Sequence, residues 1–235
     1  MKLKNKHIKI LQNFLLYNND FGYDGSGLLK TKSTSGSVFL EAFMPDFIDL
    51  PLYTRDLSSI LSFVTPESDV TEDYIKGCKY FIIKNENGTI RYRLAKEEIV
   101  NKSVNHNLDF DSMNFADLYF SFNLDKQKYD NLKNISKKLE CDMMDVYSID
   151  NEHIGLTAYK RSDKEDKQYT ITIEKQHEHN DKKATVLLGA FNLVNASDYN
   201  IEIGLIQGKT KLVPVTKVKA FCDDIVVKYI FVNAQ

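Results

Sequence analysis

The feature that most constrains the fold is an order of amphipathic segments that occurs twice along the chain. Residues 2–17 and 124–139 have the apolar periodicity of long helices, with an apolar stripe on one side and lysines on the other. Strand-like runs follow each of them, then a shorter helical segment at 54–64 or 191–196, and then further strands. The long helices are offset by about 120 residues and the short ones by about 135. This repeated order predicts two similar α+β domains within one chain.

Alternation of apolar and polar residues between turn-forming residues marks the strands, and it predicts sheets with one buried face. Residues 96–114 are polar and less regular, which indicates a connector. The predicted N-terminal domain therefore spans residues 1–110 and the C-terminal domain residues 111–235. The predicted strands are 27–32, 38–43, 47–52, 70–75, 79–84 and 89–94 in the first half, and 115–122, 145–149, 153–159, 168–174, 185–188, 200–206, 211–218 and 225–232 in the second.

The composition limits the class of protein. The chain has 235 residues, of which 43% are hydrophobic, and it has no apolar run long enough for a transmembrane helix. The first nine residues include four lysines and lack the apolar core of a secretory signal. The three cysteines lie far apart without a C-x-x-C pair, which argues against a disulfide framework or a zinc site. A reducing cytoplasm fits this cysteine usage.

The charge is distributed unevenly along the chain. The formal net charge of −2 argues against a protein that binds nucleic acid with its whole surface. Residues 2–17 carry four Lys and no acid, and residues 124–139 carry five Lys and two Asp, so these helices hold +7 and the remainder −9. Lysines opposite an apolar stripe suit contact with the phosphates of a nucleic acid that does not depend on base sequence. The alternative is an ordinary solvated helix face.

No pattern in the sequence makes a positive case for an enzyme, a metal site or a bound cofactor. Phosphate-binding loops, dinucleotide fingerprints and the serine nucleophile elbow are absent. The remaining candidates are explained more simply as surface, turn or packing residues. They are a His-Glu-His run (His177 and His179), two acidic pairs (Asp223 with Asp224, and Asp109 with Asp111), the pair Cys141 and His153, and His7 on the apolar side of the first helix.

Several local strings, in their order and spacing, resemble the sliding clamps of T-even-type bacteriophages, which are DNA polymerase processivity factors. The strings are spread over nearly the full length, and each alone is weakly specific. They are ILQNF at 10–14, FIDL at 47–50, YTRDL at 53–57 with the apolar residues at 60, 61 and 64, SDV at 68–70, the run 132–142, YNIEI at 199–203 and VVKYI at 226–230.

The resemblance implies two sliding-clamp domains per chain, each with antiparallel sheets outside and two helices inside. It implies that three copies join head to tail in a ring and that duplex DNA passes through the hole. The segment 191–196 has no basic residue, which departs from a uniformly basic lining. The residues expected to face DNA are Lys2, Lys6, Lys9, Arg55, Lys126, Lys133 and Lys137.

The resemblance also implies partners. They are the replicative DNA polymerase, an ATP-dependent clamp loader and, for late transcription, a sigma-like factor with a co-activator. Their C-terminal tails are expected in an apolar pocket near the domain junction, for which Phe110, Met113, Ile230 and Phe231 are candidates. Subunit contact is expected at the strands near 89–94 and 168–174. The expected location is the cytoplasm of an infected bacterial host.

Two other functions stay open on the sequence alone. A phage structural or assembly protein of two α+β domains, without a role in DNA replication, would self-associate independently of a loader and of ATP. A metal-dependent nuclease would cleave DNA through Asp223 or Asp224 and would lose activity with a chelator.

Overall fold

The computed structural model describes residues 2–66, 68–164, 167–176 and 182–233. The chain divides into two compact units, Met1–Asn107 (unit 1) and Leu108–Gln235 (unit 2), so the boundary lies inside the predicted connector. Strands pair antiparallel in both units, and few helices accompany them. This arrangement confirms the predicted α+β class. Among the described residues, no helix has the length and apolar character needed to cross a membrane.

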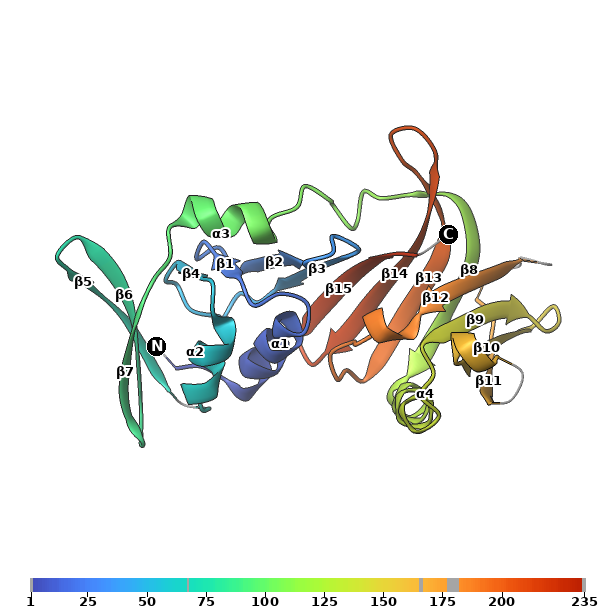
Figure 1. Cartoon of the computed structure of the whole chain (residues 1–235), viewed down its shortest axis with the longest axis horizontal. Helices are drawn as coiled ribbons and strands as arrows, with labels where there is room; N and C mark the ends of the chain where they lie inside the picture. The colour runs from blue at the N-terminus through green and yellow to red at the C-terminus, as the bar shows by residue number, and fades with distance from the viewer. Residues whose placement is uncertain (1, 67, 165–166, 177–181, 234–235) are drawn as a thin grey trace. The chain divides into compact units, whose positions relative to one another are not determined.

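Unit 1 starts with a helix and continues into small sheets (Figure 1, blue to green). Strand β1 pairs with β4, β2 pairs with β3, and β5, β6 and β7 form a sheet in that order. The helices are α1 (Asn5–Leu15), α2 (Leu57–Phe63) and α3 (Glu97–Val104). The strands are β1 (Phe21–Tyr23), β2 (Leu28–Lys32), β3 (Val38–Phe43), β4 (Leu52–Thr54), β5 (Asp69–Ile75), β6 (Cys78–Asn85) and β7 (Gly88–Arg93).

Helices α1 and α2 pack against each other through apolar stripes. Ile10 and Phe14 of α1 and Ile60 of α2 are buried, as their spacing predicts. Asp56 caps α2 by accepting the Ser59 N–H at 3.2 Å. The polar residue Asn13 of α1 is also buried.

The described residues of unit 2 form two sets of four neighbouring hydrogen-bonded strands and one long helix (Figure 1, green to red). Its strands run in the order β11-β10-β9-β12 in one sheet, and β15-β14-β13-β8 follow one another in the second. Helix α4 (Lys126–Lys138) contacts β8, β10 and β11. The strands are β8 (Phe115–Asp125), β9 (Met143–Ser148), β10 (His153–Tyr159), β11 (Gln168–Glu174), β12 (Lys183–Leu187), β13 (Asp198–Gln207), β14 (Leu212–Cys222) and β15 (Ile225–Val232). Two 3-10 turns, η1 (Arg161–Asp163) and η2 (Leu188–Ala190), complete the unit.

The predicted strand at 47–52 is wrong. Residues 44–47 form a turn in which the Met44 carbonyl accepts the Phe47 N–H at 3.1 Å, and the strand β4 begins only at Leu52. Phe47 and Ile48 are buried, so they supply apolar side chains to the core from irregular backbone. A short apolar run therefore indicated burial here but not strand geometry.

The predicted connector 96–114 contains a helix that the sequence analysis missed. Helix α3 buries Val100 and Val104, which lie four residues apart and pack with Tyr53 and Ala95. Its other positions are Glu97, Glu98, Asn101, Lys102, Ser103 and the exposed Ile99, so the buried apolar positions number only two. Packing on the small core around Tyr53 stabilises a helix that is too short to be stable by itself.

The predicted short helix at 191–196 is also wrong. After η2 the backbone is irregular, and three buried tyrosines bond to its polar groups. The Tyr129 hydroxyl donates to the Phe191 carbonyl at 3.2 Å and accepts the Leu193 N–H at 2.9 Å. The hydroxyls of Tyr229 and Tyr199 accept the N–H groups of Val194 and Ala196 at 2.9 and 3.1 Å. Side chains thus replace the intrahelical hydrogen bonds, and no α-helix corresponding to α2 forms among the described residues of unit 2.

Candidate nucleic-acid interface

Helix α4 presents an open basic face. Tyr129, Leu132 and Ser136 form its buried side, while Lys126, Lys133 and Lys137 are exposed. None of these three ammonium groups pairs with a carboxylate among the residues that the structure describes. The Lys133 Nζ lies 5.6 Å from the Tyr129 ring centroid. Three mobile cations on one helix face suit diffuse contact with a phosphate backbone.

Helix α1 presents less free charge than its sequence suggests. Lys9 is exposed, and no described carboxylate pairs with its ammonium group. Lys6 points back to the turn after β3, where its Nζ lies 3.1 Å from Asp46 and its side chain is only 19% exposed. Lys4 also pairs with Asp46. Lys2 is exposed but precedes the helix, in a bridge to Asp69. Of the predicted lysines at this end, Lys9 is the one that α1 displays openly.

Asp46 organises this end of α1 together with His7. The His7 Nδ1 accepts the Lys4 N–H at 3.4 Å, and its Nε2 lies 3.0 Å from the Asp46 Oδ1. Because Nδ1 is an acceptor, Nε2 carries the proton and donates to the carboxylate. Burial lowers the pKa of His7, although Asp46 opposes that shift. The hydrogen bond from Lys4 holds the pKa of Asp46 well below its usual range. His7 is therefore a neutral, buried capping residue.

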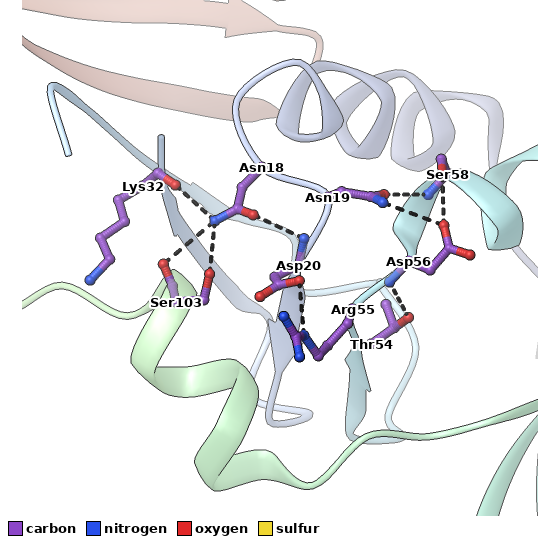
Figure 2. A network of polar contacts seen from close by, with 9 residues as sticks. All are labelled: Asn18, Asn19, Asp20, Lys32, Thr54, Arg55, Asp56, Ser58 and Ser103. Atoms are coloured by element: carbon purple, nitrogen blue, oxygen red, sulfur yellow. Dashed lines mark hydrogen bonds and ion pairs between the residues drawn. The ribbon is translucent and has the colours of Figure 1, made fainter. Parts of the chain in front are cut away.

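Arg55 lies just before α2, within a network of polar contacts (Figure 2). Its side chain is 67% exposed, and its Nε lies 3.6 Å from the Asp20 Oδ1. Next to it, hydrogen bonds from Ser58 and Ser59 lower the pKa of Asp56 to about 2, so the cap of α2 stays ionised. In Figure 2 the Asn19 side chain accepts the Ser58 N–H at 2.9 Å. Arg55 is available for an anion but is partly neutralised.

The segment 191–196 adds no positive charge to the lysine face of α4. A cavity of about 230 Å³ is lined by α4 residues, including Lys133 and Lys137, and by Leu188, Phe191 and Asn192 from this segment and the turn before it. The segment predicted as a second helix thus supplies part of the apolar wall of this cavity. The positive charge at the cavity is supplied by α4.

The four residues predicted for a partner-peptide pocket lie in two different environments. Lys217 pairs with Ile230 across the β14–β15 ladder, and its Nζ donates to the Met113 carbonyl and lies 4.6 Å from the Phe110 ring centroid. Phe110 is only 2% exposed. Phe231 follows Ile230 in β15 and so lies on the opposite face, where its ring is 5.4 Å from that of Phe191. The structure brings Phe110, Met113 and Ile230 together and separates Phe231 from them.

The residues weighed as catalytic or metal-binding candidates lie apart. Asp223 occupies the turn between β14 and β15, with φ of 53°. Asp111 pairs with Lys228 at 2.6 Å, and His153 pairs with Asp150 at 3.0 Å. Burial raises the pKa of the Cys141 thiol, which disfavours the nucleophilic thiolate. Among the described residues no group of three acidic, His or Cys side chains could hold a metal ion, and His177 and His179 fall outside them.

Comparisons with known proteins bear on the fold. No family model and no curated protein matches the sequence. A crystal structure of the proliferating cellular nuclear antigen of Entamoeba histolytica matches with a TM-score of 0.61 and 12% identity, over 97% of this chain and 94% of that one. The PCNA2–PCNA3 complex of Sulfolobus tokodaii matches with a TM-score of 0.65 and 9% identity, over 99% and 98%. Across nearly its whole length, this chain has the two-domain sliding-clamp fold of these nuclear antigens.

Proposed function

We propose that this protein is a non-enzymatic sliding clamp that encircles duplex DNA as a homotrimeric ring and tethers the replicative DNA polymerase. The observation that carries the proposal is the combination of a sliding-clamp fold over nearly the full chain with three exposed lysines of α4, Lys126, Lys133 and Lys137, that pair with no described carboxylate. The proposed clamp needs no cofactor. A bacteriophage origin, as the T-even resemblance suggests, places it in the cytoplasm of an infected bacterium.

Enclosure explains why weak, diffuse charge is enough. A closed ring is linked to DNA topologically, so it needs no tight or sequence-specific contact. The duplex presents about one negative charge per 1.7 Å of axis, and mobile lysines can follow it as the ring slides. The acidic remainder of the chain discourages DNA binding elsewhere on the protein. A net charge near zero is thus compatible with a DNA-encircling role.

Ring closure is proposed through two terminal strands, β7 and β11. The two-residue turn after Asn85 closes on Gly88, and the Leu94 N–H donates to the Lys79 carbonyl at 3.0 Å. Alternate N–H groups of β7, those of Thr89, Arg91 and Arg93, therefore point to its open edge. A β11 strand from a second copy can pair with this edge and repeat the contact head to tail.

A proline at this edge tests the closure. Arg91→Pro removes one outward N–H and spares the hydrogen bonds to β6, since proline is tolerated on edge strands. The expected result by light scattering is a fall from trimer to monomer mass. Tyr74→Pro, on the edge strand β5 of the same sheet, is the matched control and should stay trimeric. If Arg91→Pro is as trimeric as the control, β7 does not close the ring.

The proposed partners follow from the same role. A ring must be opened and closed around DNA, which implies an ATP-dependent clamp loader. The polymerase is the tethered enzyme, and a sigma-like factor with a co-activator for late transcription is a further proposed pair. The cluster of Phe110, Met113 and Ile230 is the proposed docking area for their C-terminal tails, although Phe110 must first be uncovered.

The decisive experiment separates enclosure from ordinary binding. The protein is loaded with a clamp loader onto primed circular DNA or onto the same DNA made linear, and retention after gel filtration is measured. A clamp stays on the circle and slides off free ends, and polymerase extension lengthens on the circle. Equal retention on both would reject the proposal. Self-association without any effect on DNA synthesis would instead support the structural or assembly protein.

A further inference from the structure

Unit 2 contains an apolar groove that plays no part in the proposed DNA contact or ring closure. Its volume is about 460 Å³, within the range of clefts that hold ligands or several side chains. One wall comes from β9 and β12 through Met143 and Leu187, and the other from β13 and β14 through Ile203, Leu205 and Pro214. Leu187 is 37% exposed, so the groove is open to solvent.

One border of the groove is an unpaired strand edge. Strand β12 is terminal in its sheet and pairs only with β9 among the described strands. The Leu188 N–H donates to the Asp142 carbonyl at 3.0 Å, so the N–H groups that bond β9 belong to alternate residues ending at Leu188. The N–H groups of Lys183, Thr185 and Leu187 therefore point away from β9. All three residues line the groove, which offers main-chain donors to an added strand.

An arginine, Arg161, also borders the groove. The Arg161 Nη2 lies 3.4 Å from the Met143 Sδ, and no carboxylate among the described residues pairs with this guanidinium. Its main chain is held in place, because the Arg161 N–H donates to the Asp142 Oδ1 at 2.7 Å. Lys183 pairs with Asp145 at 2.9 Å, but it shares that carboxylate with Lys164 at 2.7 Å, so one carboxylate serves two ammonium groups. The chain has four Arg against 27 Lys, so an arginine at this groove is unusual for its composition. A planar guanidinium suits bidentate recognition of a carboxylate.

The groove is separate from the area around Phe110. Pro214 lies on the opposite face of β14 from Lys217 and Lys219, because successive side chains of a strand alternate. Lys217 and Lys219 contact Phe110, whereas Pro214 lines the groove. A ligand in the groove therefore touches a different side of this sheet.

We propose that this groove binds an extended peptide of a partner protein in which apolar residues alternate with acidic ones. The peptide pairs with the outward N–H groups of β12, inserts its apolar side chains between Leu187 and Leu205, and places a carboxylate on Arg161. Charge complementarity indicates the peptide's chemistry. Arg161 pairs with no carboxylate among the described residues, and Lys183 shares Asp145 with Lys164, so the groove favours an acidic occupant. The inference does not depend on ring formation, because every contributing residue belongs to unit 2.

The test uses the full-length protein and two fluorescein-labelled heptapeptides. One alternates Leu with Asp, and the other alternates Leu with Lys. Fluorescence anisotropy should show saturable binding of the acidic peptide alone. Arg161→Glu should weaken it by about tenfold or more, as expected for loss of a charge-assisted pair and gain of a repulsion. Lys138→Glu, an equal charge change at an exposed site of unit 2 outside the groove, should leave binding unchanged.

Amide hydrogen exchange distinguishes strand pairing from simple charge attraction, because charge attraction alone would not slow exchange of the outward amides of β12. The amides of Thr185 and Leu187 should exchange rapidly in the free protein and slow at least tenfold with the acidic peptide bound. The amides of Ala184 and Val186, which bond β9, should be slow in both states. Absence of saturable binding, equal losses in Arg161→Glu and Lys138→Glu, or unchanged exchange at Thr185 and Leu187 would each overturn the proposal. A lower oligomeric mass of Arg161→Glu without peptide would also overturn it, by assigning the groove to a second copy.

Discussion

In α4 three lysines opposite the core are exposed and free of described carboxylates, whereas in α1 the lysines are divided between solvent and Asp46. Both helices have the same sequence pattern, an apolar stripe with lysines across from it. The difference comes from a loop distant in sequence, since the turn after β3 brings Asp46 to the start of α1. A helical wheel identifies the side that faces away from the core, but it cannot show what else covers that side.

A second contrast concerns the shorter element of each unit. In unit 1 the helix α2 is capped by Asp56, while in unit 2 the corresponding stretch 191–196 is irregular and held by tyrosine hydroxyls. Both solutions satisfy the backbone, one through its own helix and one through buried side chains. Two halves of similar element order therefore need not display the same surface.

The largest expected effect comes from reversing the open face of α4. Lys126→Glu, Lys133→Glu and Lys137→Glu together should lower polymerase extension on circular DNA by about tenfold or more, because three phosphate contacts become repulsions. Lys6→Glu, at a lysine already paired with Asp46, should change extension much less. The matched triple control reverses Lys84, Lys102 and Lys209, which are exposed outside α1 and α4. If polymerase extension fell equally in both triple variants, the lysines of α4 would have no special role in DNA contact.

The next effect concerns stability. Tyr129→Phe leaves the buried Leu193 N–H without its acceptor, so the free energy of unfolding should fall by about 2 kcal/mol. Urea denaturation at one fixed protein concentration measures it. Tyr92→Phe removes a hydroxyl that makes no hydrogen bond to a described residue and should change little. If Tyr129→Phe behaves like Tyr92→Phe, the hydroxyl does not hold the segment 191–196.

A smaller effect depends on pH through His7. Its pKa is lowered in the folded state, chiefly by burial, so the unfolded chain takes up the proton more readily. The contribution of neutral His7 to the free energy of unfolding should be fully present above about pH 6.5, the ordinary pKa of histidine. Below that pH the free energy of unfolding should fall by at most about 1.4 kcal/mol per pH unit. Urea midpoints at pH 8 and 5.5 test this. His7→Gln should flatten the difference, while His153→Gln, at a partly exposed histidine, should preserve it. An unchanged dependence in His7→Gln would assign it to other groups.

The smallest expected change makes α1 resemble α4. Asp46→Asn releases Lys4 and Lys6, and since Asp46 is partly exposed the stability loss should stay within about 1 kcal/mol. DNA retention should then depend more steeply on salt, by up to about 0.9 in the log–log slope for each lysine that reaches a phosphate. The salt dependence of dwell time on circular DNA measures this. An unchanged slope would mean that Asp46 does not withhold these lysines from DNA.

Strong local periodicity carried most of the fold prediction. The strands 38–43, 153–159, 168–174 and 225–232 have the predicted bounds, and both long helices form near theirs. These elements bury one face in a repeating pattern, so the spacing of their apolar residues identifies them as helices or strands. The failures lie where one or two tertiary contacts decide the backbone, as with Val100 and Val104 in α3 or Tyr129 beside the segment 191–196.

The sequence by itself determined the α+β class, the two long amphipathic helices and the exposure of Lys9, Lys126, Lys133 and Lys137, because periodicity defines which side of a helix faces away from the core. Only the tertiary structure decided that Asp46 neutralises Lys4 and Lys6, that three tyrosines replace a helix, and that β12, Met143 and Arg161 border one groove. Those outcomes depend on contacts between residues far apart in the chain. No local pattern encodes them, since each partner alone is compatible with many surroundings.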